Sequence, residues 1–256
     1  ANPAALRLQW RLRAVREHTL HLQSRRGEQG TELDALDRLA EALDDPALRA
    51  DAARRRSLRA MRMADWPAME QAGRRGAAEA AQAGDTGLRL QALRLVALAQ
   101  VHQGRYDDGR ALVAQALPEV RRLGLREVEA RLLNVLAIAA EAQGQLVEAL
   151  ALDRQSLQAF AEVGDRVNEA ISLANVGEGA MKLGALEAGE RDLLAALQRV
   201  RANGDLVFEA LVLGKLALVD RGYIGDLPGI VSFLAVGVLL VLVGWLAPSP
   251  PRRESE

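Results

Sequence analysis

The sequence predicts an all-α protein, a solenoid of antiparallel helix pairs followed by one apolar C-terminal helix. Three observations support this: glycines recur at a fixed period, the apolar residues between them follow helical spacing, and no charged residue occurs between Leu227 and Pro251. Half of the 256 residues are hydrophobic but only 3% are aromatic. The core must therefore consist mainly of Ala, Leu and Val, which favours many thin helix contacts over one thick core.

The glycine period defines the repeat. One series stands forty residues apart, and a second lies midway between its members, with Ala64 in an earlier slot: Gly84, Gly124, Gly164 and Gly204, then Gly104, Gly144 and Gly184. Two series half a period apart predict two helices per repeat, each ending at a glycine that can adopt the left-handed capping conformation.

The segments between these glycines have helical patterns. In EARLLNVLAIAAEAQG (129–144), apolar residues recur at spacings of three and four, which is typical of an apolar helix stripe. Short connections predict that neighbouring helices are antiparallel. The expected helices cover residues 3–25, 31–43, 47–63, 67–82, 87–103, 107–122, 126–143, 147–162, 166–183, 187–202 and 206–222.

Three segments resemble tetratricopeptide repeats of the long, forty-residue variety, as in regulatory regions of bacterial signalling ATPases, cyclases and transcriptional activators. They are LVALAQVHQGRYDDGRALVAQAL (95–117), NVLAIAAEAQGQLVEALALDRQSL (134–157) and NVGEGAMKLGALEAGERDLLAAL (175–197). The family's small residue at the helix crossing is matched by Ala97, Ala137 and Gly177. Its large residue after the turn is matched by Tyr106, Leu146 and Leu186, and its small residues in the second helix by Gly109, Ala149 and Gly189, then Ala116, Ser156 and Ala196.

The resemblance covers roughly residues 31–222 and weakens at both ends. Residues 1–30 are expected to form an N-terminal helix and loop. The early repeat has Trp66 at the position of the large residue after the turn, but it has Arg56 where an apolar residue is usual. The last repeat lacks its second helix. Irregular ends are expected where a solenoid is capped or cut.

The resemblance implies a concave surface lined by the first helix of each pair, which would bind a protein or peptide. The polar residues expected on it are Arg54, Arg62, Gln91, Arg94, His102, Arg131, Asn134, Glu141, Asn175, Glu178 and Lys182, with Leu58, Met61, Leu98, Val101, Ile138 and Met181 as apolar members. Asn134 and Asn175 stand out because amides on successive repeats suit the backbone of an extended peptide. The alternative is that these amides bond neighbouring turns.

Other patterns give no chemistry. The formal net charge of −1 offers no case for nucleic-acid binding, and the chain has no cysteine. His18 and His21 lie one turn apart but lack a third metal ligand, GEGAMKLG (177–184) has no preceding strand to make a phosphate loop, and the pairs Asp44–Asp45 and Asp107–Asp108 suit helix capping. We expect no enzyme activity, cofactor, metal or catalytic residue.

The C-terminal segment differs in kind. GIVSFLAVGVLLVLVGWLA (229–247) is long and apolar enough to span a membrane, after a junction at 223–228 and before a polar tail at 248–256. A buried last helix or an artefact are the alternatives. IVSFLAVGVLLVLVGWLAPSPPR (230–252) also resembles the C-terminus of a family of large, uncharacterised bacterial multi-pass membrane proteins.

Two functions are consistent with these features. One is a non-catalytic scaffold at the bacterial inner membrane with its repeats in the cytoplasm, or otherwise a cytoplasmic one. The other is the regulatory arm of a larger signalling ATPase or adenylate cyclase. No signal peptide is evident, and the start at Ala1 is consistent with a fragment.

Overall fold

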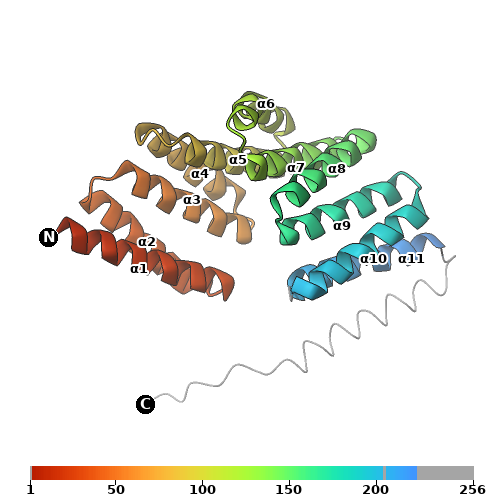
Figure 1. The fold of residues 1–256 in the computed structure, drawn as a ribbon, viewed down its shortest axis with the longest axis horizontal. Coiled ribbons are helices and arrows are strands. Elements are labelled where there is room, and N and C mark those ends of the chain that lie inside the picture. The colour runs from red at the N-terminus through yellow and green to blue at the C-terminus, as the bar shows by residue number, and fades with distance from the viewer. Residues whose placement is uncertain (1, 204–205, 224–256) are drawn as a thin grey trace, which may run out of the picture. The chain divides into compact units, whose positions relative to one another are not determined.

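The computed structural model of the chain describes residues 2–203 and 206–223, and all regular structure in that part is helical (Figure 1). The described residues form two compact units, which divide between Ser172 and Leu173. The helices are α1 (Pro3–Leu22), α2 (Arg26–Ala42), α3 (Pro46–Arg62), α4 (Trp66–Gln82), α5 (Thr86–His102), α6 (Tyr106–Arg122), α7 (Arg126–Ala142), α8 (Leu146–Val163), α9 (Arg166–Lys182), α10 (Leu186–Asn203) and α11 (Leu206–Tyr223).

A left-handed residue follows almost every helix, at intervals of twenty residues. These left-handed residues include the expected glycines from Gly84 to Gly184. They also include Ser24, Asp44 and Ala64, with φ of 57°, 46° and 53°. After this residue the chain closes the turn on the preceding helix, as where the Arg105 amide donates to the Gln100 carbonyl at 2.9 Å. One turn geometry therefore joins helices both within and between pairs.

The first two helices differ from the sequence prediction. Helix α1 ends at Leu22 and α2 begins at Arg26, whereas we expected a first helix to 25 and a second from 31. Gly27 and Gly30 both lie inside α2. Ser24, which takes the left-handed conformation, forms the turn between the helices instead.

Aspartates at helix starts were predicted to act as caps, and this is only partly correct. Asp45 caps α3, because its carboxylate accepts from the amides of Ala47 and Leu48 at 3.1 and 3.3 Å. The prediction was wrong for Asp44, which is the left-handed turn residue. Asp107 and Asp108 lie in the first turn of α6, whose cap position is Arg105. There they meet the positive end of the helix dipole without capping it.

Small residues let paired helices approach closely in the first unit. A Cβ on Gly109 of α6 would lie 2.7 Å from Val101 Cγ2 and 3.0 Å from the Ala97 carbonyl oxygen of α5. This is the predicted crossing of a small residue on each helix. The main core surrounds it with buried side chains from α3 to α7, including Leu90, Leu95 and Val113. Packing of many Ala and Val side chains thus takes the place of large aromatic groups.

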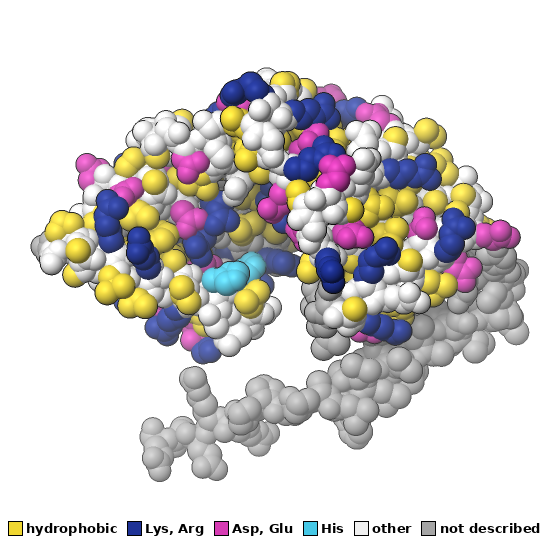
Figure 2. Space-filling view, in the orientation of Figure 1, with side chains coloured by type: hydrophobic (Ala, Val, Ile, Leu, Met, Phe, Trp, Pro, Cys, Tyr) yellow, Lys and Arg dark blue, Asp and Glu magenta, His cyan; other side chains and the backbone are white. Residues whose placement is uncertain are grey.

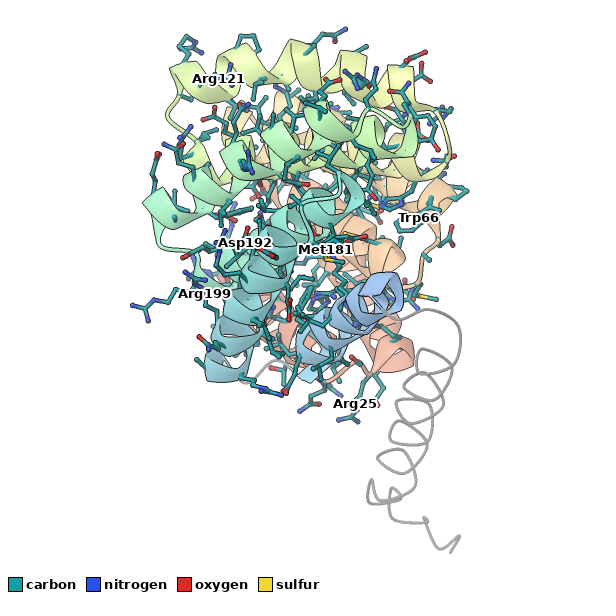
Figure 3. The ribbon with its side chains drawn as sticks, turned by 90° about the vertical axis from the view of Figure 1, so that its right-hand side faces the viewer. Arg25, Trp66, Arg121, Met181, Asp192 and Arg199 are labelled. Carbon is teal, nitrogen blue, oxygen red and sulfur yellow. The ribbon has the colours of Figure 1, made fainter. Side chains whose placement is uncertain are left out.

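The same crossing occurs in the second unit. A Cβ on Gly189 of α10 would lie 2.6 Å from the Gly177 carbonyl oxygen of α9 and 2.2 Å from Met181 Cγ. Met181 lies on α9, where Figure 3 labels it. Gly177 and Gly179 therefore lie within a repeat helix, as expected, and not in a phosphate loop.

Among the described residues, none of the helices combines the length and the apolar character needed to cross a membrane. The predicted span at 229–247 lies outside the described residues. So do Gly204, most of the predicted junction and the polar tail.

Candidate functional site

The first helices of successive pairs are neighbours within the first unit. Helix α5 contacts both α3 and α7, and the side chains that these three helices present together form a surface that we call the first-helix face. Five of the residues predicted from the sequence lie around one cavity on it, of about 240 Å³. We call this the arginine cavity. Its lining is Arg54, Leu58, Gln91, Arg94, Leu95, Glu127, Val128 and Arg131.

Arg54 enters the cavity already paired with a carboxylate. Its Nη2 and Nε donate to Asp51 Oδ1 at 2.6 and 3.1 Å, one turn earlier on α3. Burial alone would raise the Asp51 pKa, but Arg54 and Arg55 outweigh it and leave that pKa below its ordinary value. The charge of Arg54 is therefore largely satisfied.

Arg131 is also paired. It donates to Glu127 Oε1 at 2.9 and 3.1 Å, one turn earlier on α7. Asp165 Oδ2 lies 3.7 Å from its Nη2, and its guanidinium lies 5.6 Å from the centre of the Phe160 ring. Two carboxylates and an aromatic face thus hold this side chain in position.

Arg94 differs from its two neighbours. Within the part of the chain that the structure describes, its guanidinium has neither a hydrogen bond nor a salt bridge, although the side chain is half-buried. Burial lowers the Arg94 pKa to about 9, and repulsion by Arg131 and Arg54 adds to the effect. Glu127, at the same cavity, attracts Arg94 and offsets part of this effect, but its carboxylate accepts its hydrogen bonds from Arg131.

Two amides extend the polar part of the first-helix face. Gln91 lies one turn before Arg94 and is exposed, and Asn134 lies one turn after Arg131 and is half-buried. Neither amide has a hydrogen bond among the described residues. They are available to bond a ligand backbone, which has donors and acceptors of its own.

The other predicted residues of the first unit are scattered. Leu98 and Val101 are buried in the core. Arg62 is exposed at the end of α3, and Glu141 is exposed at the end of α7. His102 is exposed at the end of α5, where its ring stacks on Trp66.

In the second unit, the predicted residues form a network of their own. Glu178 accepts from Lys182 at 2.6 Å and from Lys215 at 2.7 Å, and Lys215 also donates to Asn175 Oδ1 at 3.0 Å. Asn175 thus bonds the next first helix and not a neighbouring turn. The sequence analysis missed Lys215, although it stands forty residues after Asn175, at the repeat period.

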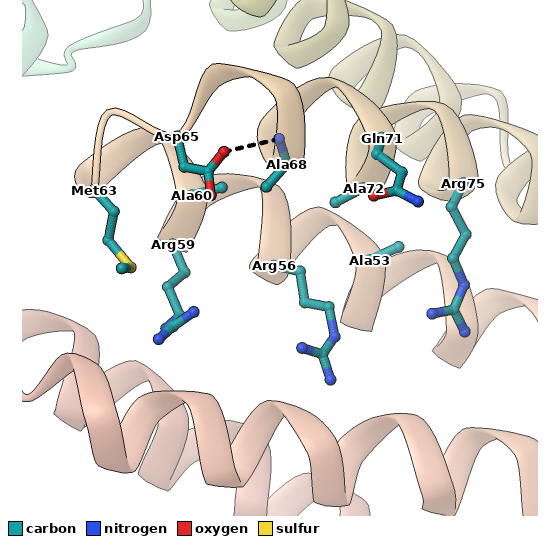
Figure 4. Close-up of a pocket in the computed structure, with 10 residues that line it drawn as sticks. All are labelled: Ala53, Arg56, Arg59, Ala60, Met63, Asp65, Ala68, Gln71, Ala72 and Arg75. Atoms are coloured by element: carbon teal, nitrogen blue, oxygen red, sulfur yellow. Dashed lines mark hydrogen bonds between the residues drawn. The ribbon is translucent and has the colours of Figure 1, made fainter.

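A larger cavity, of about 400 Å³, lies against α3 and α4 (Figure 4). Its arginines are all engaged. Arg56 donates to Asp37 and Asp34 of α2 at 2.5 and 2.6 Å, Arg59 donates to the Arg26 carbonyl at 3.1 Å, and Arg75 lies 3.5 Å from Asp37. These contacts join the first two helix pairs where Arg56 replaces the usual apolar residue. The arginines of this cavity therefore hold the first two helix pairs together.

The described residues contain no cluster of three potential metal ligands. His18 and His21 do lie close, with ring centroids 6.3 Å apart. His21 Nδ1 is within 3.3 Å of Gln29 Nε2, which donates to the buried Glu17 at 2.7 Å. This group is a buried polar network between α1 and α2.

Residues 88–162 match a family model described as tetratricopeptide repeat. They cover α5 to α8, the helices that carry most of the arginine cavity. Residues 88–162 are therefore similar to tetratricopeptide repeats. The match ends at residue 162, and nothing in the comparisons supports the resemblance of the C-terminal tail to a membrane-protein family. No curated protein sequence matches this chain.

Solved structures share the fold of this chain over most of its length. BtubC from P. vanneervenii has a TM-score of 0.66 at 17% identity and covers 92% of this chain and 97% of its own. Aspartyl phosphate phosphatase F from Bacillus subtilis has 0.73 at 13% identity, covering 91% of this chain. NprR in complex with its cognate peptide NprX has 0.62 at 20% identity, covering 84%.

The chain spans 60% of the phosphatase and 62% of NprR. At these identities the likeness establishes the fold alone.

Proposed function

We propose that the chain is a non-catalytic binding protein whose first-helix face takes up an extended segment of a partner protein or peptide. The observation that carries the proposal is the set of polar side chains without partners, Gln91, Arg94 and Asn134, on neighbouring first helices. Buried or half-buried polar groups in folded proteins normally find hydrogen-bond partners. Arg94 and Asn134 are half-buried without such partners among the described residues, and the exposed Gln91 lies one turn from Arg94, so a ligand would complete all three.

The fold gives independent support. Tetratricopeptide repeats match over α5 to α8, and one structure of the same fold is that of NprR with a bound peptide. Charge on the molecule does not suggest another partner. Acidic and basic side chains are intermixed over the face shown in Figure 2, and the formal net charge is −1. Nucleic acid needs a concentrated positive surface, so protein remains the better partner.

The remaining parts of the proposal concern location and chemistry. An apolar run such as 229–247 suits a membrane anchor. We further propose that the repeats lie on the cytoplasmic side of a bacterial inner membrane. No constellation of nucleophile, base and oxyanion donor lies on the first-helix face, so we propose binding in place of catalysis.

Selection from a display library of random peptides, carried out on the full chain in mild detergent, tests the function. We expect enrichment of peptides that bind the wild-type chain. The double variant Gln91→Ala/Asn134→Ala should weaken binding roughly tenfold, because two amide hydrogen bonds are lost. Gln115→Ala on the exposed side of α6 is the matched control and should bind normally. Failure to enrich any peptide, or equal binding by the double variant, would contradict the proposal.

A further inference from the structure

Helix α1 exposes a stripe of large apolar side chains. Leu8, Leu12 and Val15 lie on one face of the helix and are 58%, 64% and 67% exposed. We call these three residues the α1 stripe. Helix α1 lies at the end of the first unit where Figure 1 marks the N-terminus. A helix that ends a solenoid normally has a polar outer face, so exposed leucines and valine are unusual there.

The forty-residue period shows how the same face is used in later repeats. Leu12 corresponds to Ala52 of α3, to Ala92 of α5 and to Leu132 of α7. Those three residues are 0%, 0% and 1% exposed. The α1 stripe is therefore the face that first helices bury in the stack, and in α1 it is uncovered within the part of the chain that the structure describes.

The contact between α2 and α3 shows the chemistry that covers this face. Ala52 of α3 packs in one apolar cluster with Leu33 of α2. Beside that cluster, the Arg56 guanidinium donates to Asp34 and Asp37 of α2 at 2.6 and 2.5 Å. The covering helix thus supplies aliphatic side chains together with two carboxylates.

The α1 stripe has the matching positive charge. Arg16 stands forty residues before Arg56, and its side chain remains 64% exposed although it lies 3.1 Å from Glu32 of α2. Arg11 is exposed on the opposite side of the stripe. The one acidic residue of α1 is Glu17, which is buried. A second copy of α1 would therefore bring more arginines to the contact, whereas a helix with exposed carboxylates would complement it.

We propose that the α1 stripe docks an amphipathic helix of a partner protein, with aliphatic side chains flanked by Asp or Glu. The docked helix would lie on α1 as α2 lies on α3, and so would extend the stack. A lipid surface suits the stripe less well, because helices that lie in a membrane interface have a broad apolar face and Arg11 and Arg16 border this one closely. The α1 stripe lies outside the first-helix face, so its test does not depend on the proposed function.

Thiol labelling tests this docking site, because the chain has no cysteine. Val15→Cys places a thiol in the stripe, and Val147→Cys, at a 72% exposed valine of α8, is the matched control. The first probe is a peptide with the sequence of residues 26–42, RGEQGTELDALDRLAEA, stapled because an isolated helix of this length is marginal in water. The second probe is the same peptide with Asp34→Arg and Asp37→Arg.

Labelling is measured on the full chain in mild detergent. We expect the first probe to slow the labelling of Val15→Cys roughly tenfold, because a docked helix limits access to the thiol. The labelling of Val147→Cys should not change, and the second probe should protect neither thiol. Equal protection by the two probes, or by neither, would overturn the proposal.

Two further measurements distinguish the other ways of covering the stripe. If Val15→Cys reacts much more slowly than Val147→Cys without any probe, the chain or a second copy already covers the stripe, and the proposal is wrong. Protection of Val15→Cys by phosphatidylglycerol vesicles alone would identify a lipid surface instead, which would also overturn it.

Thermal unfolding of Leu12→Gln provides an independent readout. An exposed leucine contributes to docking and not to the fold, so the variant should keep the wild-type melting temperature. It should bind the first probe roughly tenfold more weakly, as the loss of one buried leucine contact allows. A lowered melting temperature, or unchanged affinity for the probe, would contradict the docking site.

Discussion

The indole of Trp66 stacks on the imidazole of His102, with ring centroids 4.0 Å apart and planes 9° from parallel. Trp66 begins α4, as Figure 3 shows, and His102 ends α5 in the next helix pair. The large residue that follows the turn therefore joins successive pairs. The contact also leaves His102 with less water around its ring, which lowers its pKa below the ordinary value.

This lowered pKa predicts a pH dependence of stability. The unfolded chain binds a proton at His102 at a higher pH than the folded chain does. The contribution to stability is therefore complete above about pH 6.5 and declines as the pH falls below that value. We expect urea unfolding to show that the free energy of unfolding falls on acidification. His102→Phe, which keeps the ring stack, should make this free energy depend less steeply on pH.

His21, whose pKa burial and Arg26 also lower, should account for part of the slope that remains in that variant. Identical pH profiles for the wild type and His102→Phe would show that the stacked ring does not titrate as described.

Glu70 predicts a second effect at lower pH. Its carboxylate accepts from Arg105, from Arg74 at 2.7 Å and from Gln103 at 2.9 Å, which ties α4 to the next pair. The hydrogen bond from Arg105 is the main cause that lowers the Glu70 pKa to about 2. The stabilisation is present above about pH 4.5 and disappears as the pH falls toward 2.

Glu70→Gln should cost about 1 kcal/mol of unfolding free energy at neutral pH, since the network is partly exposed to water. The loss should vanish near pH 2. Glu41→Gln, on an exposed part of α2, is the control and should have little effect at either pH. A Glu70→Gln chain as stable as the wild type at neutral pH would argue against the network.

Ala64 occupies a turn position that glycine fills in later repeats. Its φ of 53° is costly for a residue with a side chain. Ala64→Gly should raise the unfolding free energy by about 1 kcal/mol, and Gly104→Ala, at φ 77°, should lower it by a similar amount. In chemical denaturation, the two substitutions should change the free energy of unfolding in opposite directions. The same sign for both would mean that the turn geometry does not control stability.

The close crossing at Gly109 predicts a loss from one added methyl group. Because a Cβ there would meet the backbone of α5, Gly109→Ala should cost about 1–3 kcal/mol. Gly27 also lies inside a helix, but nothing surrounds its missing Cβ within 4 Å. Gly27→Ala should be neutral or stabilising by up to about 1 kcal/mol. Equal effects of the two substitutions would contradict the described helix contact.

Much of the fold could be predicted because its determinants are local. A left-handed turn residue recurs at a fixed interval, so glycines and apolar spacing locate most helices. The prediction failed at Ser24, where a residue with a side chain takes the turn conformation and two nearby glycines lie in a helix instead. At this turn, the twenty-residue interval indicates where a helix ends better than the presence of glycine does.

The candidate site was predicted only in part. The resemblance to tetratricopeptide repeats placed Arg54, Arg94 and Arg131 on one face, but it did not show which would be paired. A signal existed. Asp51 and Glu127 stand three and four residues before Arg54 and Arg131, within reach along a helix, whereas no acidic residue stands three or four positions from Arg94. Contacts such as Lys215 with Asn175 depend on packing between helices that local spacing does not specify.

Hydrogen exchange of the full chain, with and without a selected peptide, shows which helices a partner covers. We expect slower amide exchange on binding in the first helices α3, α5 and α7, with α4, α6 and α8 little changed. Protection confined to the second helices, or to none of these six, would contradict a binding surface on the first-helix face.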